Sequence, residues 1–536
     1  MRLEPHLAPR SANFRPLTPL DFLERAVSTY PDRPAVIWRD RSWTWSEFHG
    51  AVLRLAAHLR QRGVAPGDVV SIMCPNRPEM LAAHYAVPAV GAVLNSINTR
   101  IDRAAVAFIL GHAESRLILA DPTCASVATG AAEDTGVPIE TFAENGETGQ
   151  GLTLLAGEPA PEFDLTAAVT DEWQPIALNY TSGTTGNPKG VVLHHRGAYL
   201  NAIGNVMALG FDRATAYLWT LPMFHCNGWC HTWAVTAAGG THICLDKVEP
   251  QAIFEAIAKH GTTHLSCAPV VLYMLINHPA KETRDPTARL TVATGGAAPT
   301  AGLIQQMDAL GFDFIHLYGL TECYGPTSLR ELAEAETGLA VEERAELLAR
   351  QGIRHPTANR IRVVDEHGAD VPKDGTTIGE ILLSGNTLLA GYYRNPEATE
   401  EAFSGGGFHT GDLAVMHPDG HVEIKDRAKD VIITGGENVS SLEVESVLSR
   451  HPDVVMAAVV ARPDEKWGEI PMAFVEVKPG TRPDEAAYTA FCREHLPGFK
   501  IPRAWAFCEL PKTATGKIQK FVLREEAGRS KGAGDE

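Results

Sequence analysis

Asn179-Tyr180-Thr181-Ser182-Gly183-Thr184-Thr185-Gly186-Asn187-Pro188-Lys189-Gly190 lies between two apolar runs, residues 176–178 and 191–193, that predict strands. Glycine permits positive φ and close approach of the backbone to a ligand, and successive N–H groups in such a turn bind anions. Hydroxyl groups add donors, and Lys189 adds a positive charge suited to phosphate. Most Gly/Ser/Thr clusters are surface turns, but the flanking strands and the lysine favour a ligand-binding loop. Because a glycine follows Lys189 and the glycine spacing differs from a Walker A motif, we interpret the stretch as a polyphosphate loop of another class.

The bulk properties of the chain limit its partners. With 536 residues it is long enough for two or more domains. A net charge of −18 argues against nucleic acid or an anionic membrane as the main partner. A polyanionic ligand must therefore be held by local basic groups and backbone dipoles.

Targeting signals are absent from the sequence pattern. No apolar run approaches the roughly 20 residues that cross a bilayer. Residues 1–10 lack the apolar core of a secretory signal, and the final Gly534-Asp535-Glu536 matches no familiar sorting tripeptide. These observations predict a cytoplasmic protein without a membrane span.

The cysteines do not suggest a disulfide framework, because there are nine of them, scattered along the chain. One cluster, His225-Cys226 followed by Cys230-His231, has residue types that bind metals. Zinc sites usually combine a Cys-x2-4-Cys pair with a second, distant pair, and this cluster lacks that spacing. We therefore do not favour a zinc site.

Helical and strand patterns alternate along the first part of the chain, for example a helix at 48–62 and a strand at 68–73. This alternation predicts a mostly parallel sheet covered by helices, an α/β class. Two further strands run into polar or small-residue loops: Thr294-Gly295-Gly296-Ala297-Ala298-Pro299 and Tyr318-Gly319-Leu320-Thr321-Glu322. Doubly wound sheets place ligands at such loops, although the first loop is equally compatible with a tight turn. A glutamate there suits a hard divalent cation, and the alternative is a surface or N-cap residue.

Three later motifs, each taken alone, are only weak evidence for a functional site. They are Phe408-His409-Thr410-Gly411-Asp412-Leu413, Asp426-Arg427-Ala428-Lys429-Asp430 and Pro511-Lys512-Thr513-Ala514-Thr515-Gly516-Lys517-Ile518. A carboxylate after glycine can accept hydrogen bonds from two ribose hydroxyls, but Gly-Asp is also a common turn. The charge cluster is compatible with a solvated loop, and most lysines are exposed.

Taken together and in this order, the motifs resemble the signatures of the adenylate-forming superfamily, which includes acyl- and aryl-CoA synthetases, peptide-synthetase adenylation domains and firefly luciferase. The resemblance extends from about Phe22 to Arg524. It implies an α/β fold with a large N-terminal domain, residues 1–428, that contains doubly wound sheets and a β-rich subdomain at about 360–426. A small, mobile α/β lid, residues 429–536, would follow.

The resemblance also implies roles for individual residues. The expected catalytic residues are Lys517, Thr321, Glu322 and His225, with Glu322 also binding Mg²⁺. The expected ATP-binding residues are Thr181, Ser182, Gly183, Thr184, Thr185, Gly186, Lys189, Gly295, Gly296, Ala297, Tyr318, Gly319, Asp412 and Arg427. Lys429 would be the hinge, and the residues expected to bind coenzyme A are Gly435, Gly436 and Glu437. The expected acyl pocket consists of His225, Trp229, Gly319 and Leu320.

The implied reaction joins a small carboxylic acid to coenzyme A. The acid attacks the α-phosphate of Mg·ATP to give an acyl-adenylate and pyrophosphate, and the thiol of coenzyme A then displaces AMP. In acetyl-CoA synthetases of the superfamily a tryptophan fills the position of Gly319, so glycine there predicts room for a short- or medium-chain acid, including branched or thioether acids such as methylthiopropionate. Aryl acids of the benzoate or cinnamate type are the alternative. Amino-acid adenylation and a non-catalytic nucleotide sensor are less favoured, and a homodimer is left open.

Overall fold

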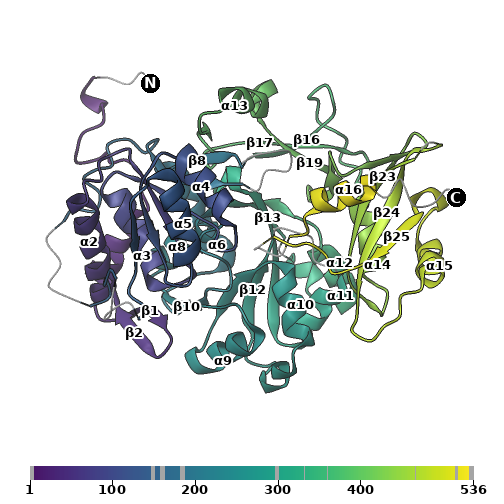
Figure 1. Ribbon diagram of the computed structural model, residues 1–536, viewed down its shortest axis with the longest axis horizontal. Coiled ribbons are helices and arrows are strands. Elements are labelled where there is room, and N and C mark those ends of the chain that lie inside the picture. Colours follow the sequence, from purple (N-terminus) through teal and green to yellow (C-terminus); the bar gives the residue numbers. More distant parts are fainter. Residues whose placement is uncertain are drawn as a thin grey trace.

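The computed structural model describes residues 5–145, 151–156, 163–181, 188–295, 301–330, 332–358, 360–464, 466–513 and 517–529. It has a mixed α/β fold with a large N-terminal domain and a small C-terminal domain, which occupies one end of the molecule (Figure 1). No helix among these residues combines the length and apolar character needed to cross a bilayer. The boundary expected at residue 429 stays a prediction.

One sheet of the large domain carries the phosphate-loop stretch. Its strand order in the described residues is β18-β8-β7-β4-β3-β5-β6, and β7, β4, β3, β5 and β6 run parallel. The expected strands at either end of the loop are β7 and β8, which pair antiparallel as a hairpin. The strands are β3 (Val69–Met73), β4 (Val93–Ser96), β5 (Ser115–Ala120), β6 (Ile139–Thr141), β7 (Pro175–Tyr180), β8 (Gly190–His194) and β18 (Gly391–Tyr392).

A second sheet has the order β15-β14-β13-β12-β11-β9-β10-β1-β2 in the described residues. Its centre, from β13 to β1, is parallel, which confirms the doubly wound α/β class, and antiparallel strands close both edges. The strands are β1 (Pro34–Trp38), β2 (Arg41–Thr44), β9 (Ala216–Leu218), β10 (Thr241–Cys244), β11 (His264–Cys267), β12 (Leu290–Thr294), β13 (Phe312–Leu320), β14 (Gly325–Arg330) and β15 (Ile353–Arg354).

Helices cover both sheets. The helix predicted at 48–62 is α2, which begins at Trp45 because Thr44 caps it in a capping box with Glu47. Every residue of α3 is buried, as expected of a helix packed on all sides. The helices around these two sheets are α1 (Leu20–Thr29), α2 (Trp45–Gln61), α3 (Pro78–Ala89), α4 (Arg103–His112), α5 (Ala125–Thr135), α6 (His195–Leu209), α8 (His231–Ala238), α9 (Pro250–His260), α10 (Pro269–Asn277), α11 (Ala301–Ala309) and α12 (Val341–Leu348).

The charged segment 331–351 has a helical sequence pattern, from which an exposed helical insertion is expected, but the structure differs. Among its described residues, 332–351, the helical elements are α12 and a short 3₁₀ turn, Glu334–Glu336. Ala345 and Leu348 are buried, and α12 packs against α11. The segment is therefore a cover for the second sheet as well as a solvated surface, because one face of α12 is apolar.

The β-rich subdomain forms an antiparallel sheet with the order β16-β17-β19-β20. Its strands are β16 (Arg360–Val364), β17 (Gly379–Ser384), β19 (Phe408–Met416) and β20 (Val422–Arg427), and helix α13 (Pro396–Ala402) lies beside it. A turn at residues 418–420 joins β19 to β20. β20 ends at Arg427, immediately before the charge cluster that leads into the small domain.

The small domain contains a sheet of order β22-β21-β24-β23 with β25 paired to β24. The two glycines expected to bind coenzyme A form the turn of a hairpin, in which Gly435 and Gly436 have φ of 61° and 87°. Two positive φ values fit a tight hairpin turn, where glycine is favoured. The elements are β21 (Ile432–Thr434), β22 (Glu437–Val439), α14 (Ser441–Leu448), β23 (Val454–Asp464), β24 (Gly468–Val477), α15 (Glu485–His495), β25 (Ala504–Phe507) and α16 (Lys520–Arg529).

Gly319 lies at an irregularity in the pairing of β13 with β14, where the register shifts between Tyr318 and Gly319. A Cβ atom built at Gly319 would lie only 1.6 Å from the backbone oxygen of Gly325. Glycine is needed here because the neighbouring strand occupies the space that a side chain would fill.

We expect Gly319→Ala to destabilise the large domain by about 3 kcal/mol or more, because the strand backbone must move to remove the clash. Gly302→Ala in α11 is the matched control, since a Cβ there meets no atom within 4 Å. The control should leave stability unchanged or raise it slightly through helix propensity. The measurement is the thermal unfolding temperature of each variant relative to wild type. If Gly319→Ala unfolds at the wild-type temperature, the close packing of Gly319 against β14 is contradicted.

Candidate active site

A buried polar network lies below the phosphate-loop stretch. Asn179, near the end of β7, donates from Nδ2 to Oδ1 of Asn227 at 2.9 Å, and its own Oδ1 lies 2.9 Å from Oγ of Ser96. The same Ser96 hydroxyl lies 3.0 Å from the backbone oxygen of Phe224. The network joins the base of the phosphate loop to the segment that carries His225, so the two predicted substrate-binding segments are held in a fixed relation.

Asn76 holds the segment that leads to His225. Its Nδ2 donates to the backbone oxygens of Trp219 and Leu221 at 2.9 and 3.0 Å, and its Oδ1 accepts from the N–H of Met223 at 2.8 Å. This side chain supplies hydrogen bonds that the backbone lacks beyond the end of β9. Asn76 could not be recognised from the sequence, because a single asparagine in a loop belongs to no motif or periodic pattern.

His225 is followed by a left-handed turn. The turn comprises Cys226, Asn227, Gly228, Trp229 and Cys230, with φ of 48°, 52°, 62°, 53° and 61°. L-residues avoid this region by about 1–2 kcal/mol each, and such strain persists only where surrounding contacts impose the conformation. Contacts of this kind include the Asn227 bond to Asn179 and a 2.8 Å bond from Nδ2 of Asn205 to the oxygen of Trp229.

Thr321 and Glu322 form a short turn directly after β13. Sγ of Cys226 donates to Oγ1 of Thr321 at 3.3 Å, and the Tyr392 hydroxyl donates to Oε1 of Glu322 at 3.0 Å. Burial is the main cause that raises the pKa of Glu322, while the bond from Tyr392 and the nearby Arg427 oppose it. The structure thus places the predicted catalytic threonine beside the His225 segment.

Asp412 is buried, with 3% of its surface exposed, and links two parts of the large domain. It accepts from the Tyr318 hydroxyl at 2.7 Å and lies 3.2 Å from Nε of Arg427. Burial, followed by the Asp412 charge, raises the pKa of Tyr318, so this phenol is a donor at all ordinary pH values. Three predicted nucleotide-binding residues therefore form one contiguous group.

Lys517 approaches the same group of residues from the small domain. Its pKa falls to about 8, first because the surrounding protein removes part of its hydration and then because of the Arg427 charge, while Asp412 opposes the shift. The side chain is nevertheless exposed. His225 has its pKa lowered to about 4 by burial and then by the Lys517 ammonium, so it is neutral at physiological pH.

The structure does not bring every predicted residue to this group. The hairpin turn at Gly435 and Gly436 packs against Trp467 of its own domain, and Glu437 is exposed. Lys429, in contrast, follows β20 and does lie near the group, and its pKa is lowered first by burial and then by Arg427. Thr181 and Lys189 pair at the base of the loop, where the N–H of Thr181 donates to the oxygen of Lys189. The predicted residues that lie outside the described part of the chain are Ser182, Gly183, Thr184, Thr185, Gly186, Gly296 and Ala297.

Gly319 does not show that the acyl pocket is roomy, contrary to the prediction from the sequence. The missing side chain would point at the backbone of β14, so its absence reflects strand packing and does not measure pocket depth. Trp229 is 7% exposed; a Cβ atom at Gly295 would lie 3.1 Å from its ring, and one at Gly325 3.0 Å from its backbone. Trp229 thus fills the space between β12 and β14, and the half-buried Leu320 follows Gly319 on β13.

Side chains of the Cys/His cluster contact other protein groups. Nδ1 of His231 lies 2.9 Å from the Tyr217 hydroxyl, and burial lowers the His231 pKa to about 3. Burial raises the pKa of the Cys226 thiol to about 12. No group of three or more His, Cys, Asp or Glu residues arranged to hold a metal occurs in the described parts of the chain.

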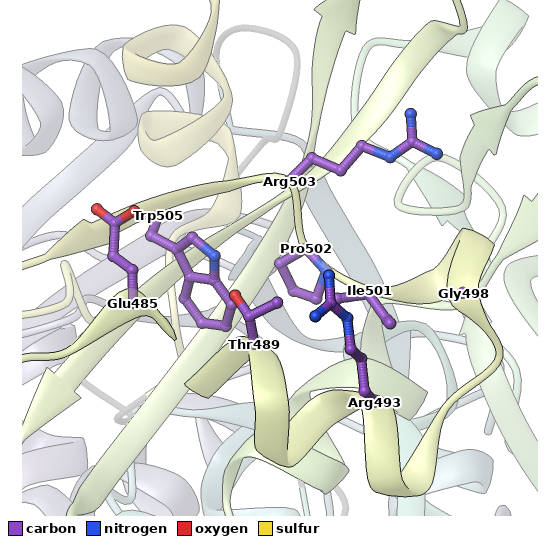
Figure 2. Close-up of a pocket in the computed structure, with 8 residues that line it drawn as sticks. All are labelled: Glu485, Thr489, Arg493, Gly498, Ile501, Pro502, Arg503 and Trp505. Carbon is purple, nitrogen blue, oxygen red and sulfur yellow. The ribbon is translucent and has the colours of Figure 1, made fainter. Parts of the chain in front are cut away.

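A groove of about 460 Å³ lies elsewhere, on the small domain between α15 and the segment that leads into β25 (Figure 2). Thr489, Arg493 and Trp505 are among its lining residues. It shares no residue with the predicted site, and we assign it no ligand.

The chain belongs to the AMP-binding enzyme family, which matches residues 23–393, and the C-terminal domain of such enzymes matches residues 443–517. This confirms the resemblance to adenylate-forming enzymes. The solved structure of ATP-bound MatB from Rhodopseudomonas palustris aligns with a TM-score of 0.82 at 28% identity, covering 95% of this chain and 98% of that one.

Several curated relatives are CoA ligases. The peroxisomal acetate/butyrate–CoA ligase AAE7 of Arabidopsis thaliana is 44% identical over 96% of this chain and 95% of its own length. The 2-methylpropanoate–CoA ligase CCL4 of Humulus lupulus is 44% identical, with 97% of each chain covered. The peroxisomal benzoate–CoA ligase of Arabidopsis thaliana is 42% identical over 97% of this chain and 95% of its own. The protein is accordingly an ATP-dependent acid–CoA ligase, an acid–thiol ligase.

These relatives contradict the predicted cytoplasmic location, because two of them bear peroxisomal names. The physical reason for the error is that sorting signals are addresses read by receptors, and bulk composition does not encode them. The lack of a familiar C-terminal tripeptide was therefore a poor guide.

Proposed function

We propose that the cleft between the two domains forms an acyl-adenylate from ATP and a short- or medium-chain carboxylic acid, and that the same enzyme then transfers the acyl group to coenzyme A. The position of Lys517 is the observation that carries the first step. This lysine lies within electrostatic reach of His225, Arg427 and Asp412, which come from three different segments of the large domain. A cation is thus available between the acid-binding segment that carries His225 and the predicted ribose site at Asp412.

The residues would divide the adenylation step as follows. Lys189 and the phosphate loop hold the β- and γ-phosphates, and Asp412 accepts hydrogen bonds from the ribose. Thr321 donates to the α-phosphate, while Lys517 stabilises the negative charge that develops as the carboxylate attacks. Neutral His225 borders the carboxylate. Charge stabilisation and positioning account for most of the catalysis in such transfers.

Glu322 fits a divalent cation such as Mg²⁺. It offers hard oxygen atoms in a half-buried turn, and Mg²⁺ commonly uses one or two carboxylates while substrate phosphates and water complete its coordination. A single carboxylate agrees with the lack of a larger ligand cluster in the described residues. When bound, the cation would neutralise charge on the phosphate oxygens.

The second step requires the small domain to move. In the present arrangement Lys517 is near the cleft, while the hairpin of Gly435, Gly436 and Glu437 lies on the surface of its own domain. Rotation about Lys429 would withdraw Lys517 and bring this hairpin to the cleft, where it would line the path of the coenzyme A thiol. Hinge residues absorb such a change through a few backbone torsions.

The acid is proposed from the relatives and from Trp229. The relatives named above act on acetate or butyrate, on 2-methylpropanoate and on benzoate. Trp229 fills one side of the pocket region, which favours compact acids, including branched or thioether acids, over long chains. Aryl acids are the second candidate because of the benzoate-specific relative. Fatty acid metabolism is the corresponding setting, and the homodimer stays a prediction.

The first test measures pyrophosphate release with ATP and Mg²⁺ for a panel of acids, each with and without coenzyme A. The panel runs from acetate to laurate and includes 2-methylpropanoate, methylthiopropionate, benzoate and cinnamate. We expect coenzyme-A-dependent turnover to peak at a compact aliphatic or thioether acid. A preference for benzoate or cinnamate would retain the reaction and overturn the pocket assignment, and no release with any acid would overturn the reaction itself.

The lowered pKa of Lys517 predicts a pH dependence of adenylate formation. The ammonium charge is present below about pH 8 and is lost as pH rises through that value, so the rate should fall on the alkaline side. His225 stays neutral throughout this range. The charged groups around Lys517 are Arg427, Asp412, Lys429 and Asp430. The measurement is ATP–pyrophosphate exchange between about pH 6.5 and 9.5.

Lys517→Arg is the matched variant for this profile, because arginine keeps its charge at alkaline pH. It should be slower overall but should lose the alkaline decline. The same decline in both proteins would assign it to another group.

Lys429→Pro tests the hinge. Proline fixes φ near −65° and so restricts the rotation, while the position just after β20 should tolerate it in the present arrangement. Adenylation should remain close to wild type, and thioester formation should fall about ten-fold or more. Lys429→Ala is the control that removes the charge without restricting the backbone. Equal losses in both half-reactions of Lys429→Pro would exclude a hinge role.

A further inference from the structure

Tyr392 lies between the phosphate loop and the Glu322 turn. It belongs to β18, which pairs with β8 so that Tyr392 is opposite Val191, two residues beyond Lys189. Leu389, three residues before Tyr392, donates its N–H to the backbone oxygen of Glu322 at 2.7 Å. The segment is therefore attached both to the strand that leaves the phosphate loop and to the turn that carries the proposed cation ligand.

The side chain of Tyr392 contacts the charged groups of both elements. Its hydroxyl donates to Oε1 of Glu322 at 3.0 Å, and Nζ of Lys189 lies 4.8 Å from the centre of its ring. The first contact is a charge-assisted hydrogen bond and the second is a cation–π interaction. One ring thus contacts an anionic and a cationic side chain.

The backbone around Tyr392 is fixed. Its N–H donates to Oγ1 of Thr399 at 3.0 Å, and the N–H of Tyr393 donates to the oxygen of Gly190 at 2.7 Å. The ring is half-buried. A phenol donor fixed in this way can orient a carboxylate through its hydrogen bond.

Opposite charges at close range attract one another and would otherwise pair. A direct Lys189–Glu322 ion pair would occupy the groups needed for a polyphosphate and its cation. We propose that Tyr392 is a positioning residue that orients the Glu322 carboxylate for a divalent cation and holds the Lys189 ammonium over its ring, so that these opposite charges bind the nucleotide complex instead of each other. This inference rests on the proposed nucleotide site and adds a residue that the motif analysis did not identify.

The test compares Tyr392→Phe, which keeps the ring and removes the hydrogen bond, with Tyr392→Leu, which removes both contacts. Tyr393→Phe is the matched control: it deletes a hydroxyl one residue away, where the partner is Glu114. Calorimetry measures ATP binding over a range of Mg²⁺ concentrations without acid or coenzyme A, so that no turnover occurs. Thermal unfolding checks that each variant is folded.

We expect Tyr392→Phe to raise the Mg²⁺ concentration needed for half-maximal ATP binding by about three- to ten-fold, because one charge-assisted hydrogen bond is lost. Tyr392→Leu should raise it further and also weaken ATP binding at saturating Mg²⁺, because Lys189 can then pair with Glu322. Tyr393→Phe should match the wild type. Should Tyr392→Leu fail to fold, Tyr392→Phe alone decides the matter.

Two results would overturn the inference: an unchanged Mg²⁺ dependence in Tyr392→Phe, or the same shift in Tyr393→Phe. A wild-type protein that binds ATP equally with and without Mg²⁺ would also overturn it, because Glu322 would then have no cation to hold. These outcomes are separate from the acid panel, which reports turnover. The ligase reaction could therefore be confirmed while the role of Tyr392 is rejected, or the reverse.

Discussion

The buried carboxylate of Asp412 accepts a hydrogen bond from Tyr318 and pairs with Arg427, and the cleft depends on these two contacts. A buried charge is costly unless it is paired and hydrogen-bonded, and removing one partner leaves the remaining charge uncompensated. The carboxylate therefore fixes the end of β13 against the β-rich subdomain. Arg427 is the last residue of β20, so the same contacts also fix the point from which the chain enters the small domain.

The two sides of the candidate site, one in the large domain and one in the small domain, are built differently. On the large-domain side, the left-handed turn after His225 is held by buried side chains such as Asn227 and Asn179, which constrain a strained backbone. Lys517, in contrast, lies on a loop of the small domain, where its N–H donates to Oγ1 of Thr513, and its side chain remains open to solvent. Such a division suits a reaction in which the acid and nucleotide stay in place while the lysine approaches and withdraws.

The charges of the cleft differ from those of the whole protein. The chain has a net charge of −18, yet Arg427, Lys429 and Lys517 interact with one another in the cleft around Asp412. Loss of hydration, followed by repulsion from Arg427, lowers the pKa of Lys517, which makes its charge sensitive to pH near 8. An anionic nucleotide would relieve that repulsion. An anionic ligand near these residues would therefore be attracted by local charges and not by the overall charge of the protein.

Sequence alone determined the α/β class, the family and the order of the motifs. These features are local: strand and helix periodicity, a loop rich in small and hydroxyl residues, and charged residues at fixed positions in short motifs. The helix beginning at Trp45 and the strand β3 could be predicted because their apolar patterns are regular. The motif around Lys517 could be recognised for the same reason, since all its residues are close together in the chain.

Only the tertiary structure decided which distant residues meet and why some local choices are necessary. Tyr392 contacts Glu322 across 70 positions, and Cys226 contacts Thr321 across 95, so no short pattern records either pair. The structure also explains Gly319 differently from the sequence. A side chain is excluded there by a backbone atom of the paired strand β14, and not by the need for a larger acyl pocket. Periodicity shows which face of an element is apolar, but contacts between distant segments depend on strand register and packing, which arise only when the whole chain folds.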